Sequence, residues 1–169
     1  PHPKRATSTW NKYQILLDYI LYDKKVERSQ DMPLPFGAYS FITEMNNSVS
    51  LNTKSANKKI RVDFFKHAFF QDFPVVILAC WDYIRNDGEN RQIDNTFDVR
   101  FEMDGENRIG EHLYDNGLKF YIHRNEDKTK LVIHTHQLSQ AISDRMLQDM
   151  AKIIREHLDN IGKFPYHFG

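Results

Sequence analysis

The chain has 169 residues, of which 40% are hydrophobic and 13% aromatic, which is enough for one domain with one core. Its 23 Lys and Arg residues balance its 23 Asp and Glu residues, which excludes a global electrostatic attraction to nucleic acid or to an anionic membrane. Because the longest apolar run is far shorter than the roughly 18 residues of a membrane span, we expect a soluble, cytoplasmic protein with no membrane contact.

The N-terminal residues 1–7 contain Pro1 and Pro3 and show no hydrophobic period, so we expect a disordered lead. No linker rich in Gly, Ser or Pro divides residues 8–169, which are therefore predicted to form a single α+β domain. The lone Cys80 lies in the most apolar run. It cannot form an internal disulfide, which predicts a buried thiol and a reducing compartment.

Apolar residues at helical spacing predict two longer helices and one short helix. The first begins at Ser8 or Thr9 and ends near residue 24, and the last is long, begins at Ser139 and closes at Gly162. Between them, a short aromatic helix is predicted from Asp63 to about residue 70.

Strands are predicted where β-branched and aromatic residues form runs or alternate with polar ones. The predicted segments are 36–45, 49–54, 60–62, 74–83, 96–103, 118–124 and 130–138. The run 74–83 is the most apolar and is expected to be buried on both faces at the centre of the sheet. Residues 85–95, rich in Asn, Asp and Gly, are predicted to form a loop, and 125–129 to connect a hairpin.

This order of elements predicts an α+β fold. Its sheet is expected to be mixed but mostly antiparallel, flanked by an N-terminal helix and a long C-terminal helix.

A first candidate site lies around Asn52-Thr53-Lys54, with Glu44 on the preceding predicted strand. Together with the apolar strand that follows, these residues resemble the core of PD-(D/E)XK nucleases, the restriction-endonuclease-like superfamily. In that family an acidic residue and a D/E-x-K tripeptide on the next strand hold a divalent metal beside a phosphodiester. The resemblance implies Mg²⁺ as the cofactor, Glu44, Asn52 and Lys54 as catalytic residues, and Asp31 or Glu44 as the acidic metal ligand. Asn52 stands where the family has a carboxylate.

The resemblance implies a metal-dependent nuclease that acts on nucleic acid, in a prokaryotic defence or mobile-element context. Lys58, Lys59 and Arg61 form a local basic cluster that could contact phosphates, although the same residues also fit a solubilising turn. The alternative is a non-catalytic immunity, anti-restriction or complex-subunit protein that binds another protein. Zero net charge, the Asn52 departure and the acidic segments 82–98 and 104–115 favour that alternative.

A second candidate site lies on the predicted hairpin, with His123 on its first strand and His134 and His136 on its second. If paired residue numbers have an odd sum, all three imidazoles lie on one face together with Tyr121. Three imidazole nitrogens can bind Zn²⁺ and leave a fourth position for water, whose pKa the metal lowers. This arrangement predicts, as a further alternative, a zinc hydrolase. The same pattern also fits a solvated histidine face with the intervening apolar residues buried.

Overall fold

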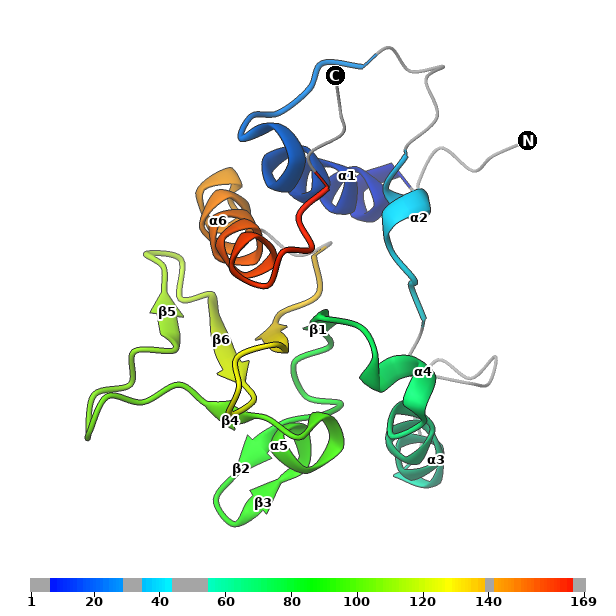
Figure 1. The fold of residues 1–169 in the computed structure, drawn as a ribbon, viewed down its shortest axis with the longest axis vertical. Coiled ribbons are helices and arrows are strands. Elements are labelled where there is room, and N and C mark those ends of the chain that lie inside the picture. Colours follow the sequence, from blue (N-terminus) through cyan, green and yellow to red (C-terminus); the bar gives the residue numbers. More distant parts are fainter. Residues whose placement is uncertain (1–6, 29–34, 44–54, 139–141, 166–169) are drawn as a thin grey trace. The chain divides into compact units, whose positions relative to one another are not determined.

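A computed structural model describes residues 7–28, 35–43, 55–138 and 142–165. The protein has an α+β fold with a mixed, mostly antiparallel sheet and a C-terminal helix, as predicted (Figure 1). Contacts within the chain define two compact units, of which one comprises residues 1–42 and 138–169 and the other residues 43–137. The first unit is helical and the second contains the sheet. The expectation of a single domain over 8–169 stays a prediction.

The helical unit is built from α1 (Thr7–Tyr22), α2 (Phe36–Tyr39) and α6 (Asp144–Asn160). The α1 and α6 helices pack against each other, and Lys12 Nζ donates to the Ile142 carbonyl at 2.8 Å. Apolar residues of α6 at helical spacing are buried: Met146, Leu147, Met150, Ala151 and Ile154. Both long helices were therefore located correctly from their apolar periodicity.

The ends of α6 differ partly from the prediction. Ser143 caps its N-terminus by accepting a hydrogen bond from the Met146 backbone N–H at 3.2 Å, whereas the predicted cap, Ser139, lies outside the described residues. At the other end Gly162 adopts a φ of 67°, the left-handed conformation that ends many helices and that glycine tolerates best.

A buried polar network attaches the segment after α1 to the helix itself. Asp18 is 1% exposed and accepts from Arg28 Nη2 at 2.6 Å, from Gln14 Nε2 at 2.8 Å and from the Val26 backbone N–H at 3.2 Å. Gln14 in turn accepts from the Phe36 backbone N–H at 3.0 Å. The network thus supplies partners for buried polar groups of two segments that have little regular structure.

The main sheet contains β1 (Val75–Ala79), β4 (Arg100–Phe101), β5 (Glu111–Leu113), β6 (Lys119–Arg124) and β7 (Leu131–Thr135). Its strand order is β1-β7-β6-β4, and β5 also pairs with β6. Only the β1–β7 pair is parallel. The antiparallel β6–β7 hairpin confirms the prediction for 118–124 and 130–138.

The centre of the sheet was predicted wrongly. In the described part of the chain β1 pairs with β7 alone and ends the strand order, while every residue of β7 is buried. Only Leu78 is buried in β1. The residues of β1 are at least partly buried on both faces, which accounts for its continuous apolar run although it lies at the end of the strand order.

One face of the sheet packs against α3 (Ser55–Phe65), α4 (Ala68–Gln71) and α5 (Gln92–Phe97). Buried apolar side chains from these helices, their connections and the sheet form one cluster: Phe65, Phe70, Leu78, Ile84, Ile93, Phe97, Val99 and Val132. This cluster fixes the helices of the sheet unit to the strands that carry the histidines.

Several predicted strands are helical instead. Residues 60–62 belong to α3, the described part of 36–45 begins with α2, and 96–103 contributes only β4 after the last turn of α5. Segments this short cannot distinguish a period of 2 from one of 3.6. Asp63 is correspondingly an interior residue of α3, and 49–54 lies outside the described residues.

The predicted loop 85–95 contains a small hairpin, β2 (Asn86–Asp87) with β3 (Asn90–Arg91), and the start of α5. Its polar residues serve as structural partners, since Asn86 Oδ1 accepts from the backbone N–H of Ile93 at 3.0 Å. Across the described segments, no helix combines the length and the apolar character needed to cross a bilayer.

Candidate functional site

The residues predicted from the nuclease resemblance lie mostly outside the described part of the chain: Asp31, Glu44, Asn52 and Lys54. The Mg²⁺ site therefore stays a prediction. Of the basic cluster, Lys58, Lys59 and Arg61 lie on α3 and not in a turn.

The histidine residues are brought together on the β6–β7 hairpin. Tyr121 pairs with His134 and His123 with Val132, so the paired numbers have an odd sum and Tyr121, His123 and His134 share a face, as the condition required. His136 follows β7 directly and stacks on the same aromatic group. We call this group, which comprises Trp81, Tyr121, His123, His134 and His136, the histidine face.

His123 forms the centre of a buried polar network. Its Nδ1 lies 3.0 Å from Asp94 Oδ1, and the two side chains are 3% and 2% exposed. Asp94 also accepts from Asn86 Nδ2 at 2.7 Å and from Arg91 Nη2 at 2.6 Å. The β2–β3 hairpin and the first turn of α5 supply these partners, so residues from a segment predicted to be a loop position a histidine of the central strand pair.

The network decides the charge of Asp94 and the tautomer of His123. Burial alone would raise the pKa of the Asp94 carboxyl, but hydrogen bonds from His123, Asn86 and Arg91 outweigh burial and lower the pKa below its ordinary value. An ionised carboxylate only accepts hydrogen bonds, so we assign the proton of this bond to His123 Nδ1. In the neutral ring, Nε2 then holds the lone pair.

His134 is oriented in a different way. Its Nε2 lies 3.0 Å from the carbonyl oxygen of Trp81, and because a carbonyl only accepts, this nitrogen carries the proton. Burial lowers the pKa of His134 to about 4. The imidazole is therefore neutral at pH 7, with its lone pair on Nδ1.

Trp81 lies flat across the histidine face. Its indole stacks on His136 at 3.8 Å between ring centroids, on His134 at 5.2 Å and on Tyr121 at 5.7 Å, with interplanar angles between 13° and 17°. Its φ of 25° is unusual for a bulky residue. The backbone is held there because Trp81 N–H donates to Thr135 at 3.2 Å and its carbonyl accepts from His134. Strained backbone kept in this way is typical of functional sites.

Charged residues border the aromatic group. Lys119 Nζ lies 5.2 Å from the centroid of the Tyr121 ring, and Glu111 accepts from Lys119 at 3.0 Å and from Arg108 at 2.7 Å. The hydrogen bonds from Arg108 and Lys119 lower the pKa of Glu111. Two cations thus share one carboxylate, so these three side chains together carry a net charge of +1.

The described residues contain no group of three His, Cys, Asp or Glu side chains that could hold a metal ion. His123, His134 and His136 are all described, and they do not form such a group. The Zn²⁺ site proposed for them gains no support from the structure and stays a prediction. Sequence reasoning missed Asp94, Asn86 and the position of Trp81. Trp81 lies two residues beyond the end of β1, in a connection of the kind where functional residues often lie, whereas the partner of His123 is 29 residues away along the chain and leaves no local pattern.

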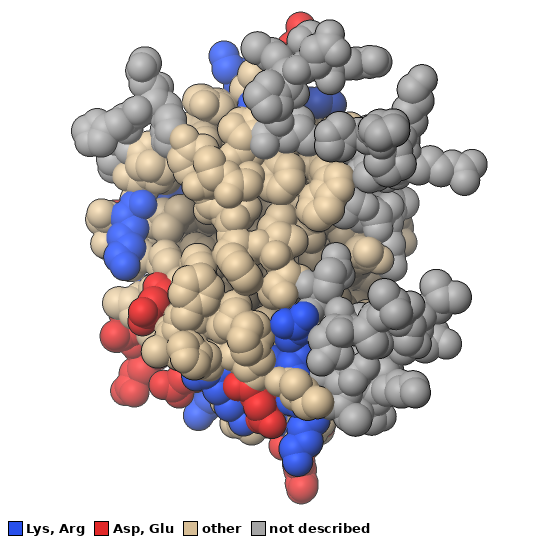
Figure 2. Space-filling model, turned by 90° about the vertical axis from the view of Figure 1, so that its right-hand side faces the viewer, with Lys and Arg blue, Asp and Glu red and all other residues tan. Residues whose placement is uncertain are grey.

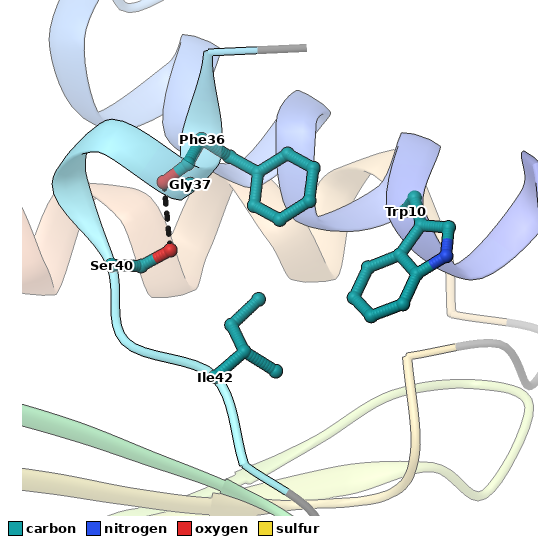
Figure 3. A pocket seen from close by; sticks show the side chains of 5 residues that line it. All are labelled: Trp10, Phe36, Gly37, Ser40 and Ile42. Carbon is teal, nitrogen blue, oxygen red and sulfur yellow. Dashed lines mark hydrogen bonds between the residues drawn. The ribbon is translucent and has the colours of Figure 1, made fainter.

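A separate apolar hollow lies in the helical unit, lined by Trp10, Phe36, Gly37, Ser40 and Ile42 (Figure 3). The rings of Trp10 and Phe36 stack at 5.7 Å, and Ser40 Oγ donates to the Phe36 carbonyl at 2.7 Å. None of the lining side chains titrates, so the hollow offers no acid–base chemistry.

Comparison with known proteins found no match among protein-family models, curated proteins or solved structures. The resemblance to PD-(D/E)XK nucleases accordingly rests on the residues quoted for it.

Proposed function

We propose that the protein cleaves phosphodiester bonds in single-stranded RNA by acid–base catalysis, with His123 as the general base. The observation that carries the proposal is the 3.0 Å contact between His123 Nδ1 and the buried Asp94 carboxylate. A carboxylate that holds one imidazole nitrogen fixes the tautomer and leaves the lone pair on the other nitrogen, the arrangement used in hydrolytic triads. Because the His123 side chain is only 3% exposed, the RNA has to displace neighbouring side chains to reach this nitrogen.

RNA is the favoured substrate because it carries its own nucleophile. His123 Nε2 takes the proton of a 2′-hydroxyl, the 2′-oxygen attacks the adjacent phosphorus, and the bond from phosphorus to the 5′-oxygen breaks. The leaving 5′-oxygen takes a proton from water, and the products are a 2′,3′-cyclic phosphate and a 5′-hydroxyl. No metal is needed to generate this nucleophile, and DNA lacks it.

The surroundings of His123 supply the remaining requirements. Trp81 and Tyr121 are partly exposed aromatic rings of the kind on which unpaired bases stack. Lys119 lies against Tyr121, four residues from His123 along β6, and adds positive charge that attracts the phosphates of a bound strand. Burial of the Asp94–His123 pair strengthens its electrostatic interaction relative to water.

The test is an RNase assay with labelled single-stranded RNA, single-stranded DNA and duplex DNA, each in EDTA and in Mg²⁺. We expect RNA alone to be cut, at equal rates in both buffers, and His123→Gln to lower the rate by at least about 100-fold. The matched control is His112→Gln, because His112 pairs with Phe120 and so lies on the opposite face of the same sheet; its rate should stay within about twofold of wild type.

Two results would contradict the proposal. Unchanged cleavage by His123→Gln would remove the base from the mechanism. Cleavage that requires Mg²⁺ and is lost in Lys54→Ala would instead favour the metal-dependent nuclease implied by the resemblance.

A further inference from the structure

A ridge of exposed apolar side chains runs along α3 and α4. Ile60 is 59% exposed and Phe64 46%, and their spacing of four residues places them on the same side of α3. Phe69 of α4 is 49% exposed. Ile60, Phe64 and Phe69 are called the α3–α4 ridge. Figure 2 shows one face of the molecule, on which the coloured Lys, Arg, Asp and Glu residues lie mainly at the margins.

The aromatic members of the ridge are anchored to the core. Phe64 packs edge-on against Phe70 at 4.6 Å between centroids, and Phe69 packs against Phe70 at 5.1 Å and against Phe73 at 5.3 Å. Phe70 itself is 7% exposed and belongs to the buried cluster. The exposed rings are therefore held in place before any partner arrives, which lowers the entropic cost of binding.

The ridge is bordered by positive charge. Residues 59–71, whose side chains the structure describes, contain three basic side chains and one acidic one, a net charge of +2 in a chain whose net charge is zero; the basic residues are Lys59, Arg61 and Lys66. Lys66 contacts Asp63 at 3.4 Å, and both side chains are more than half exposed. Exposed pairs of this kind exchange partners at little cost.

Arg61 has no carboxylate partner in the described part of the chain. Its guanidinium lies 5.4 Å from the centroid of Phe64, and its Nε is buried without a hydrogen bond. A buried donor without a partner is uncommon in folded proteins. Arg61 as a whole is half-buried, so a carboxylate from outside could be met only by the part of the guanidinium that remains at the surface.

We propose that the α3–α4 ridge binds an acidic amphipathic helix of a partner protein. Apolar side chains at a spacing of four residues form the ridge that packs into the groove of a second helix, and acidic residues beside that groove complement Lys59, Arg61 and Lys66. The chemistry favours a protein over single-stranded nucleic acid, because the most exposed member, Ile60, has no ring for a base to stack on, and Arg61 already lies over Phe64. This surface is separate from the proposed catalytic residues.

The probe is a synthetic helical peptide with Leu along one face and Glu on the other, compared with the same peptide in which every Glu is Lys. Fluorescence anisotropy should show at least about tenfold tighter binding of the Glu peptide. NMR shift changes should map to α3 and α4. We expect Ile60→Glu and Lys59→Glu each to weaken peptide binding by about tenfold or more, and Ile60→Glu to leave RNA cleavage unchanged.

The matched control is Ile109→Glu, since Ile109 is 54% exposed elsewhere in the same unit; it should bind the peptide as wild type does. Equal binding of the Lys peptide, or an equal loss in Ile109→Glu, would overturn the proposal. Failure of the Glu peptide to bind would also overturn it. Self-association in sedimentation, RNA binding or binding to anionic vesicles that depends on Ile60 would then identify the occupant as a second copy, a nucleic acid or a membrane. Lys59→Glu changes only an exposed side chain, which keeps the test valid if Ile60→Glu misfolds.

Discussion

Two buried aspartates, one in each unit, accept hydrogen bonds from similar donors but differ in one partner. Asp18 and Asp94 are 1% and 2% exposed, and each accepts hydrogen bonds from an arginine and from a side-chain amide. The further partner of Asp18 is a backbone N–H, whereas that of Asp94 is the ring of His123. A carboxylate with fixed partners can only hold segments together, whereas one beside an imidazole can also direct a proton near neutral pH.

The largest expected effect on folding is common to both aspartates. Asp18→Ala leaves the largely buried Arg28 without its counter-charge, and Asp94→Ala leaves the buried donors of His123 and Asn86 without their acceptor, so each should lower the free energy of unfolding by roughly 3 kcal/mol. Urea denaturation followed by circular dichroism measures this. A loss below about 1 kcal/mol for either variant would show that its network is not a stabilising unit.

The pH dependence should come mainly from the histidine face. Below pH 6.5 the unfolded chain protonates His134, whereas the folded protein keeps it neutral until about pH 4. The unfolded state then binds more protons, so stability falls as pH drops through this window, by about 3 kcal/mol in total.

Denaturation midpoints between pH 4 and 7 test this, with His134→Asn expected to flatten the profile. The control is His67→Asn, because His67 is exposed and caps α4, a role that Asn can fill. The lowered pKa of Asp94 acts in a lower window: its contribution is lost only as pH falls below about 4, through the folded-state pKa. An unchanged profile in His134→Asn would assign the pH dependence to other groups.

A smaller effect should separate the two arginines. The Arg28 side chain is 16% exposed and that of Arg91 47%, so solvent screens the second pair more strongly. We expect Arg28→Gln to cost about 2 kcal/mol and Arg91→Gln about 1 kcal/mol or less. Thermal unfolding at two salt concentrations measures both. A larger loss of unfolding free energy in Arg91→Gln than in Arg28→Gln would contradict this ranking of the two ion pairs.

The sequence predicted the parts of the molecule in which periodicity is long. The two long helices, α1 and α6, and the β6–β7 hairpin follow from it. The parity of the strand pairing, on which the common histidine face depends, was left open by the sequence. The three-residue segment 60–62 was too short to assign, and α3 formed there. The partners of His123 were not predictable, because Asn86 and Asp94 reach it through tertiary packing of a segment that has only the composition of a loop.

The most direct test of the account compares Asp94→Asn with Asp18→Asn in the RNase assay, with rates corrected for the folded fraction. Both substitutions remove a buried charge of similar exposure, but only Asp94 orients His123. The account predicts that Asp94→Asn lowers cleavage by at least about 100-fold while Asp18→Asn stays within about twofold of wild type. Equal losses in the two variants, or no RNA cleavage by the wild-type protein, would contradict it.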